Sequence, residues 1–530
     1  MSIELQKMLF QEHPTRRALF SYVSTHPKDY HVQVFRNHSF ELVEHTIEAY
    51  LDYADLGIDF TYSGYDDSLS FLELDSTADL ILLWIDTTRY EHDDVIEFLN
   101  GRMIQLRQRC TVPILLIPFG KEIPPIREDI VVYDLTAIND KLGVDFTDER
   151  AKAVTGTSLS SRAMLEISRE LGLRYLPSLL RPPLKAVVVD LDNTLYQGVL
   201  GEDGEQGVIL TAGHKLLQER LHKLAAEGVF LCAVSKNNAD DVNELLKQRK
   251  DFPLLKTDFT KICASWDPKA VSIRNIAKYL NINVDSMVFV DDNIGELTAV
   301  QAVFPDIKLI HASDNAAQTA EILSYFPGML RLKISHEDGI RKDDVKANER
   351  RQTLKHTLAP EEYLQSLQLH LTYDYGNPEQ IQRIAELSNK TNQFIFNYKR
   401  YSQAEVESRM SSDLYCIVTI SLSDRLSDSG LIGVCVGRKL LDAVEIEECF
   451  ISCRALGRGI DDVIVLGAIQ GICDEFKSAK VKVLFKDGPR NEPAHRFVYE
   501  RLAEYLEGPG NFSYCFPKNL LTIKIIKKEG

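Results

Sequence analysis

The 530-residue sequence has no long apolar run, no closely spaced cysteine pairs and no internal repeat. A membrane-spanning helix needs about 20 consecutive apolar residues, so we expect no membrane partner. Nine cysteines without paired short spacings provide neither a disulfide framework nor a zinc site. The segment 1–17 is polar and lacks the apolar centre of a secretory signal. These absences predict a cytoplasmic protein in a reducing compartment.

Basic residues are too few for a general nucleic-acid-binding protein. Asp and Glu number 78 against 61 Lys and Arg, which gives a formal net charge of −17. Phosphate backbones need a basic surface, so we expect no nucleic-acid partner. The hydrophobic fraction of 44% and the charged fraction of 26% are typical of soluble globular proteins. The length exceeds what one core supports and predicts about three domains.

We expect an α/β protein with three domains and one linker. Apolar strands that alternate with helices predict a small N-terminal α/β domain over 1–181, flavodoxin-like or SGNH-like, with a parallel sheet. Arg181-Pro182-Pro183 marks its end because proline does not extend a helix. A second α/β domain is predicted over 182–330 and a third domain over 360–530. Between them, 331–359 is strongly charged and predicts a helical linker or a clamp.

Within the N-terminal domain, a polar segment joins a predicted strand over 30–35 to a predicted helix over 40–53. It reads Arg36-Asn37-His38-Ser39-Phe40. Ser39 there is either a helix cap or part of an anion or nucleophile site. We favour the cap, because serine is among the residues preferred at a helix N-terminus.

The strongest chemical signal is the run from Lys185 to Thr194, a β-branched apolar stretch that stops at Asp190-Leu191-Asp192-Asn193-Thr194. Such a run predicts a buried parallel strand that delivers its polar residues to the carboxyl edge of the sheet, where ligands bind. Two carboxylates at that spacing can face one pocket and hold Mg²⁺.

Three further signals follow in order. Leu231 to Asn238 is a second apolar strand that ends in Ser235-Lys236-Asn237. Lys269 opens a predicted helix and can supply a fixed cation. Met287 to Asn293 repeats the design of a strand that runs into an acidic pair, Asp291-Asp292, and gives the remaining metal ligands. The alternative is that these residues only cap strands and helices in an ordinary α/β domain and have no catalytic role.

The gaps between these signals leave no room for a lid domain. Between Thr194 and Ser235 only a flap over 198–207 and one helix over 215–227 fit. An open site of this kind suits a substrate presented on a macromolecule or closed over by a neighbouring domain.

A glycine-rich turn in the third domain is a second candidate site. The segment Ser452-Cys453-Arg454-Ala455-Leu456-Gly457-Arg458-Gly459 lies between a predicted strand over 443–451 and a predicted helix over 461–476. Backbone N–H groups there can point at an anion beside the helix N-terminus. Cys453, next to Arg454 and Arg458, can be held as a thiolate, although most cysteines are inert small hydrophobes.

These motifs resemble known families. Asp190-x-Asp192-x-Thr194 is similar to motif I of the haloacid dehalogenase (HAD) superfamily, and the central domain resembles its capless Rossmann-like members. The resemblance implies that Asp190 is the nucleophile and Asp192 the general acid and base. It also implies that Thr194, Ser235, Lys236 and Asn237 bind the phosphoryl group, that Lys269 is catalytic, and that Asp190, Asp192, Asp291 and Asp292 hold Mg²⁺.

The glycine turn resembles the pyrophosphate loop of GNAT-type acyltransferases. That likeness implies a coenzyme A or pantetheine site made by Arg454, Gly457, Arg458 and Gly459. The later Asn491, Ala494 and Tyr499 are similar to the closing segment of that fold, but Tyr499 is displaced by one position and receives no catalytic role.

Taken together, the segments 190–204, 235–237, 266–269, 289–293, 390–394 and 452–459 resemble the FkbH-like family, HAD subfamily IIIC. The family implies a glyceryl transferase/phosphatase that takes 1,3-bisphosphoglycerate, removes phosphate, and leaves D-glyceryl as a thioester on an acyl carrier protein for a polyketide-type pathway. Cys453 or the carrier's pantetheine thiol would attack the acyl phosphate. One departure is Tyr196-Gln197, where the family usually has Trp-Gly.

Two alternatives stay open. The first is a plain Mg²⁺-dependent HAD phosphatase that acts on a protein or sugar phosphate, with the third domain as a docking module. The second, a scaffold with inactive sites, is disfavoured because the charged catalytic positions are all intact.

Overall fold

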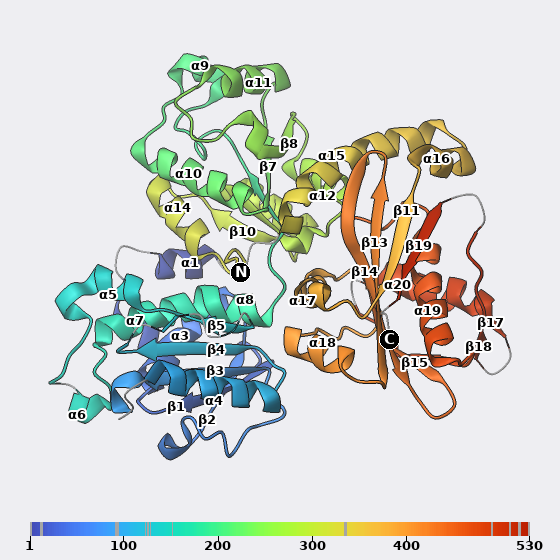
Figure 1. Ribbon diagram of the computed structural model, residues 1–530. Coiled ribbons are helices and arrows are strands. Elements are labelled where there is room, and N and C mark those ends of the chain that lie inside the picture. Colours follow the sequence, from blue (N-terminus) through green and yellow to red (C-terminus); the bar gives the residue numbers. More distant parts are fainter. Residues whose placement is uncertain are drawn as a thin grey trace. The chain divides into compact units, whose positions relative to one another are not determined.

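The computed structural model describes residues 3–10, 14–90, 95–121, 123–124, 127, 129–150, 152–332, 336–488, 491–507, 510–517 and 521–527. The chain forms two compact units (Figure 1). The first comprises 1–276 and 283–334, and the second comprises 277–282 and 335–530. Within the described residues, no helix combines the length and apolarity needed to cross a membrane.

The first sheet of the first unit lies in the N-terminal part of the chain. It has five parallel strands in the order β2-β1-β3-β4-β5, so the predicted parallel α/β architecture is confirmed here. The strands are β1 (Tyr30–Arg36), β2 (Ile58–Tyr62), β3 (Leu80–Asp86), β4 (Ile114–Phe119) and β5 (Ile130–Val132). The helices are α1 (Ile3–Leu9), α2 (Arg16–Phe20), α3 (Glu41–Tyr53), α4 (Val95–Arg109), α5 (Thr136–Leu142), α6 (Lys152–Thr155), α7 (Ser161–Glu170) and α8 (Leu176–Leu180).

Burial explains the apolar runs of this sheet. All seven residues of β3 are buried, because α3 and α7 pack on one face and α4 on the other. Ser39 differs from its predicted role: Phe40 occupies the N-cap position of α3, and the Ser39 hydroxyl donates to the Glu41 carboxylate.

The second sheet of the same unit is also five-stranded and parallel, in the order β10-β9-β6-β7-β8. The strands are β6 (Ala186–Val189), β7 (Phe230–Ser235), β8 (Phe259–Ala264), β9 (Met287–Asp291) and β10 (Lys308–His311). The helices are α9 (Leu200–Gly207), α10 (Ala212–Ala226), α11 (Ala239–Gln248), α12 (Lys269–Leu280), α13 (Ile294–Val303) and α14 (Ala316–Tyr325). The central strand, β6, is buried at every residue and carries the first acidic motif at its carboxyl end.

The second unit is built on a mainly antiparallel sheet in the order β12-β15-β14-β13-β11-β19, with β16 paired to β15. Its strands are β11 (His370–Tyr375), β12 (Phe394–Ile395), β13 (Tyr415–Asp424), β14 (Ser427–Lys439), β15 (Val444–Ile451), β16 (Val481–Val483) and β19 (Thr522–Ile526), with a separate pair β17 (Leu506–Glu507) and β18 (Asn511–Phe512). Its helices are α15 (His336–Thr357), α16 (Pro360–Leu367), α17 (Ile381–Lys390), α18 (Gln403–Met410), α19 (Asp461–Phe476) and α20 (Glu492–Arg496).

The sheet of the second unit is covered on both faces. One core forms beneath α19, and another beneath α17 and α18. The predicted hairpin is present, since β13 and β14 pair antiparallel across a tight turn. The charged helix α15 contacts β14 and therefore belongs to this unit.

Candidate active site

Local backbone conformation brings the first acidic motif to the carboxyl edge of the second sheet. The Asp190 backbone N–H donates to the Val290 carbonyl at 2.9 Å, which ties the end of β6 to β9. Asn193 then takes a left-handed conformation, φ 53°, which asparagine tolerates better than most residues. The Asn193 side chain accepts a hydrogen bond from the Gly198 N–H at 3.0 Å. After this turn the chain continues into the flap, and Asp190 lies at the carboxyl edge of the sheet.

Three carboxylates converge at this edge. Asp190, Asp291 and Asp292 each offer an oxygen, and these oxygens all lie within 4.8 Å of one another. Lys269, the first residue of α12, joins two of them: its Nζ lies 2.9 Å from Asp190 Oδ1 and 2.6 Å from Asp291 Oδ2. Residues about 100 positions apart thus share one cluster, as the order of the motifs predicts.

Burial of Asp190 and Asp291 shifts the pKa values of this cluster. Burial raises the pKa of Asp190 to about 7 even though the Lys269 ammonium opposes the shift. Burial likewise raises the pKa of Asp291, again against Lys269. For Lys269, burial favours the neutral amine, but the carboxylates of Asp190 and Asp291 outweigh it and raise the pKa. One ammonium therefore does not neutralise the carboxylates around it.

This donor set fits a hard divalent cation. Three carboxyl groups lie beside one ammonium, and two of them, Asp190 and Asp291, are buried. Mg²⁺ prefers a few carboxylate oxygens and keeps some of its waters. Asp190, Asp291 and Asp292 are the residues that would hold it.

Asp192 does not join this cluster through its side chain. Its Oδ2 accepts from Asn237 Nδ2 at 2.8 Å, and its Oδ1 accepts from the Tyr196 hydroxyl at 2.8 Å and from the Leu200 N–H at 3.1 Å. These three donors hold the Asp192 carboxylate beside the flap, outside the group of three, and its role as a metal ligand stays a prediction. Tyr196 and Leu200 were not predicted to contact it. Their proximity in sequence was the local signal, since Tyr196 follows Asp192 by four positions and Leu200 by eight.

Of the four residues predicted to bind a phosphoryl group, three are buried and the fourth, Lys236, is exposed. Ser235 and Asn237 are buried together at the end of β7, where Asn237 Nδ2 also lies 2.8 Å from Ser235 Oγ. Thr194 is buried, and its hydroxyl has no hydrogen-bond partner among the described residues. Lys236 differs, because its ammonium pairs with Glu296 on α13.

The site carries no inserted lid in the predicted gap. Between β6 and β7 the chain forms α9, a short helix inside the predicted flap, and then α10. Between β7 and the helix that begins at Lys269 it forms α11 and β8. Both gaps are therefore filled by elements of the sheet domain itself.

The glycine turn of the second unit has the backbone of an anion loop, but a carboxylate already lies in it. Gly457 and Gly459 have φ of 79° and 82°, conformations that favour glycine. Both carboxylate oxygens of Asp461 lie 3.3 Å from the Gly457 backbone nitrogen. The Lys355 ammonium donates to the Gly457 carbonyl at 2.8 Å.

Arg458 is not available as the predicted pantetheine ligand. Its guanidinium is 2% exposed and lies 3.0 Å from Asp344 Oδ2 and 3.5 Å from Asp424 Oδ2. This ion pair could not be predicted from the sequence, because Asp344 lies 114 residues upstream, where no local pattern links it to the loop. Arg454 stays near the turn, with its Nε 3.5 Å from Ser452 Oγ. Cys453 is a partly exposed free cysteine, and Arg458 does not supply the cation expected beside it.

Comparison with known proteins gives only remote likenesses. No protein-family model matches the chain, and no curated protein matches its sequence significantly. It is similar to the solved N-terminal part of a Bacteroides fragilis protein that contains a phosphatase domain, in complex with Mg, at 19% identity and a TM-score of 0.47, over 62% of this chain and 98% of that one. An uncharacterized Corynebacterium glutamicum protein matches at 18% identity and a TM-score of 0.19, over 27% of this chain and 95% of that one. Neither likeness assigns a function to this chain.

Proposed function

We propose that this chain is a Mg²⁺-dependent phosphatase of the HAD type with Asp190 as its nucleophile. The observation that carries the proposal is the contact of Lys269 with both Asp190 and Asp291, which gathers a nucleophile, a fixed cation and metal-binding carboxylates at the carboxyl edge of a parallel sheet. The Bacteroides fragilis structure, which is complexed with Mg, agrees with that cofactor.

The two carboxyl groups of the first motif have different roles, with Asp190 as the nucleophile and Asp192 as the general acid and base. Asp190 attacks phosphorus, the ester P–O bond breaks, and Asp192 gives a proton to the leaving oxygen. Water then attacks the aspartyl-phosphate, loses a proton to Asp192, and inorganic phosphate leaves while Asp190 is regenerated. A bound Mg²⁺ would supply charge neutralisation at the phosphoryl oxygens. The hydrogen bonds from Tyr196, Asn237 and Leu200 fix where the Asp192 carboxyl lies.

We also propose the finer activity that the motifs resemble, glyceryl transfer to an acyl carrier protein. A thiolate, either Cys453 or the carrier's pantetheine, attacks the C1 carbonyl of 1,3-bisphosphoglycerate, and the C–O bond to phosphate breaks to give a phosphoglyceryl thioester. Where Cys453 is the first acceptor, the carrier's thiolate then attacks that thioester, and the Cys453 thiolate leaves. Asp190 then removes the remaining 3-phosphate. The partly exposed Cys453 supports this proposal, since a thiol nucleophile must be reachable.

The test is a loading experiment. We expect that enzyme, Mg²⁺, 1,3-bisphosphoglycerate and a phosphopantetheinylated carrier protein give a carrier heavier by one glyceryl group in intact-protein mass spectrometry. Omission of Mg²⁺ is the control and leaves the 3-phosphate in place. A carrier of unchanged mass would count against the transferase, while phosphate release from simple monoesters would still support the phosphatase.

The second candidate, a plain phosphatase with a C-terminal docking module, is favoured by one observation. The loop amide of Gly457 already donates to Asp461, and Arg458 is held by buried aspartates, so two predicted pantetheine contacts are occupied. This candidate predicts carrier-independent phosphate release that is indifferent to Cys453→Ala.

Lys269 provides a separate test of the site. We expect Lys269→Met to lower kcat/KM for p-nitrophenyl phosphate by about 10²–10³-fold, since a preorganised cation at the reacting group would be lost. The matched control is Lys278→Met in the last turn of the same helix, where the side chain is exposed. A Lys269→Met enzyme as fast as the control would show that the ammonium has no role in the reaction.

A further inference from the structure

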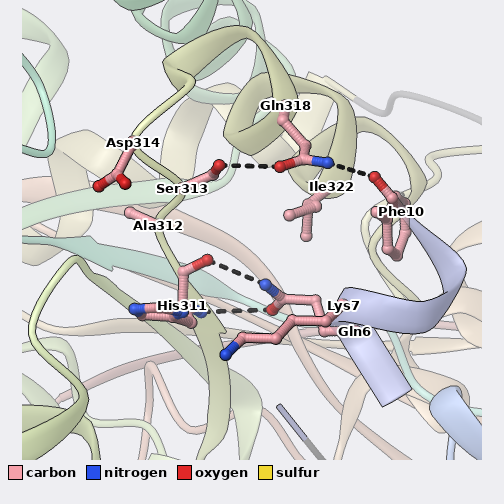
Figure 2. A pocket seen from close by; sticks show the side chains of 9 residues that line it. All are labelled: Gln6, Lys7, Phe10, His311, Ala312, Ser313, Asp314, Gln318 and Ile322. Atoms are coloured by element: carbon pink, nitrogen blue, oxygen red, sulfur yellow. Dashed lines mark hydrogen bonds between the residues drawn. The ribbon is translucent and has the colours of Figure 1, made fainter. Parts of the chain in front are cut away.

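The helix α1, near the start of the chain, is fixed to the strand beside the metal-binding carboxylates. Gln6 is 4% exposed, and its side-chain amide makes two hydrogen bonds to the backbone of His311. Gln6 Nε2 donates to the His311 carbonyl at 2.9 Å, and the His311 N–H donates to Gln6 Oε1 at 3.2 Å. Figure 2 shows this pairing at the wall of a cavity of ≈ 270 Å³. Because β10 is an edge strand of its sheet, Gln6 supplies hydrogen-bond partners to His311 on the side where no described strand pairs with β10.

His311 in turn contacts the backbone of the acidic pair, Asp291 and Asp292. It lies opposite Asp291 in the parallel register of β9 and β10. Its ring Nε2 lies 3.0 Å from the Asp292 carbonyl, which accepts only if that nitrogen carries the proton. The next residue, Ala312, donates its N–H to the Asp291 carbonyl at 2.9 Å. Both acidic residues are therefore held through their backbones by the end of β10.

The carboxyl end of α1 packs into the core of the first unit. Phe10 packs edge-on against Tyr53 of α3 with ring centroids 5.7 Å apart, and Leu9 and Phe10 belong to the core that also contains β6. On the other side of the cavity, Gln318 of α14 donates to the Phe10 carbonyl and accepts from the Ser313 hydroxyl (Figure 2). The position of Gln6 is therefore fixed before any substrate binds.

We propose that Gln6 and His311 are positioning residues that set the geometry of the Asp291–Asp292 carboxylates for Mg²⁺. Groups that orient metal ligands through hydrogen bonds typically change metal affinity by 10–100-fold when they are removed. The inference rests on the phosphatase proposed above, and it adds that the segment before the first sheet is part of the metal site's support.

The test measures Mg²⁺ binding directly by calorimetry, without substrate. Gln6→Met keeps the side-chain volume but removes both hydrogen bonds, and we expect the Kd for Mg²⁺ to rise about 10-fold or more. Lys7→Ala is the matched control, because Lys7 is exposed, lines the same cavity and belongs to the same helix. It is expected to bind Mg²⁺ as the unchanged protein does.

The outcomes separate the two proposals. If the unchanged protein does not bind Mg²⁺, the proposed function fails. If it binds and Gln6→Met binds equally well, the proposed function stands and the positioning role is overturned. Should Gln6→Met not fold, the comparison passes to His311→Ala and His311→Gln. The role is supported if His311→Ala binds Mg²⁺ more weakly and His311→Gln, whose amide can still donate to Asp292, restores the affinity. It is overturned if both variants bind Mg²⁺ as the unchanged protein does.

Discussion

Asp190→Asn is expected to reduce phosphate release by about 10⁴-fold or more, because an amide does not form the aspartyl-phosphate that the proposed reaction requires. The measurement is phosphate release from p-nitrophenyl phosphate with saturating Mg²⁺. Asn is close in size to Asp and removes a charge from a site where burial already raises the pKa of the carboxyl. We therefore expect the thermal stability of the metal-free protein to be kept or raised, so that lost activity does not reflect unfolding.

The matched control is Asp306→Asn, an exposed carboxylate in the turn before β10. In the loading experiment, Asp190→Asn is expected to leave a phosphoglyceryl group on the carrier, whereas Cys453→Ala blocks loading altogether if the protein thiol is the acceptor. Failure of both variants at the same step would contradict this division of labour. Unimpaired phosphate release by Asp190→Asn would remove the nucleophile assignment itself.

The strand-end carboxylates were predictable from sequence because each depends on a local pattern. A buried strand such as Ala186–Val189 ends at the carboxyl edge of the sheet, where ligands bind. The residues that follow it, here carboxylates, therefore indicate which ligand the edge can hold. The parallel order of β9, β6 and β7 then brings these ends together. The strands β5 and β10 were not predicted, because they bury only one and two residues and lack the fully buried apolar run of β6.

Side-chain partners across long separations could not be predicted. Gln6 and His311 are 305 residues apart, and nothing in the sequence near either residue signals the other. The same applies to Arg458, whose neighbours Gly457 and Gly459 predicted an anion site, while its actual partners come from α15 and β13. A charged residue beside a glycine turn indicates a ligand contact. The fold determines whether a buried carboxylate of the same protein pairs with that residue instead.

Asp344→Ala is expected to destabilise the second unit by about 3–5 kcal/mol, the usual result of removing one partner from a buried ion pair. Asp344 lies 3.1 Å from Arg351 and 3.0 Å from Arg458, and these arginines also pair with Asp424. All four side chains are at most 3% exposed. The variant leaves two buried guanidinium groups with one carboxylate. The measurement is urea unfolding, with hydrogen exchange of α15 and β14 to localise the loss.

The pH dependence of that loss follows from the same contacts. Burial alone would raise the pKa of Asp344, but Arg458, the Ser427 hydroxyl and Arg351 outweigh it and hold the pKa below its ordinary value. A depressed folded pKa stabilises above the unfolded value, about 3.9, and this contribution disappears as pH falls through the folded pKa. The stability gap between the unchanged protein and Asp344→Ala should therefore narrow below about pH 4. Arg425→Ala, an exposed neighbour of Asp424, should change stability by about 0.5 kcal/mol or less at every pH. A gap that stays constant down to pH 3 would mean that Asp344 does not act through its charge.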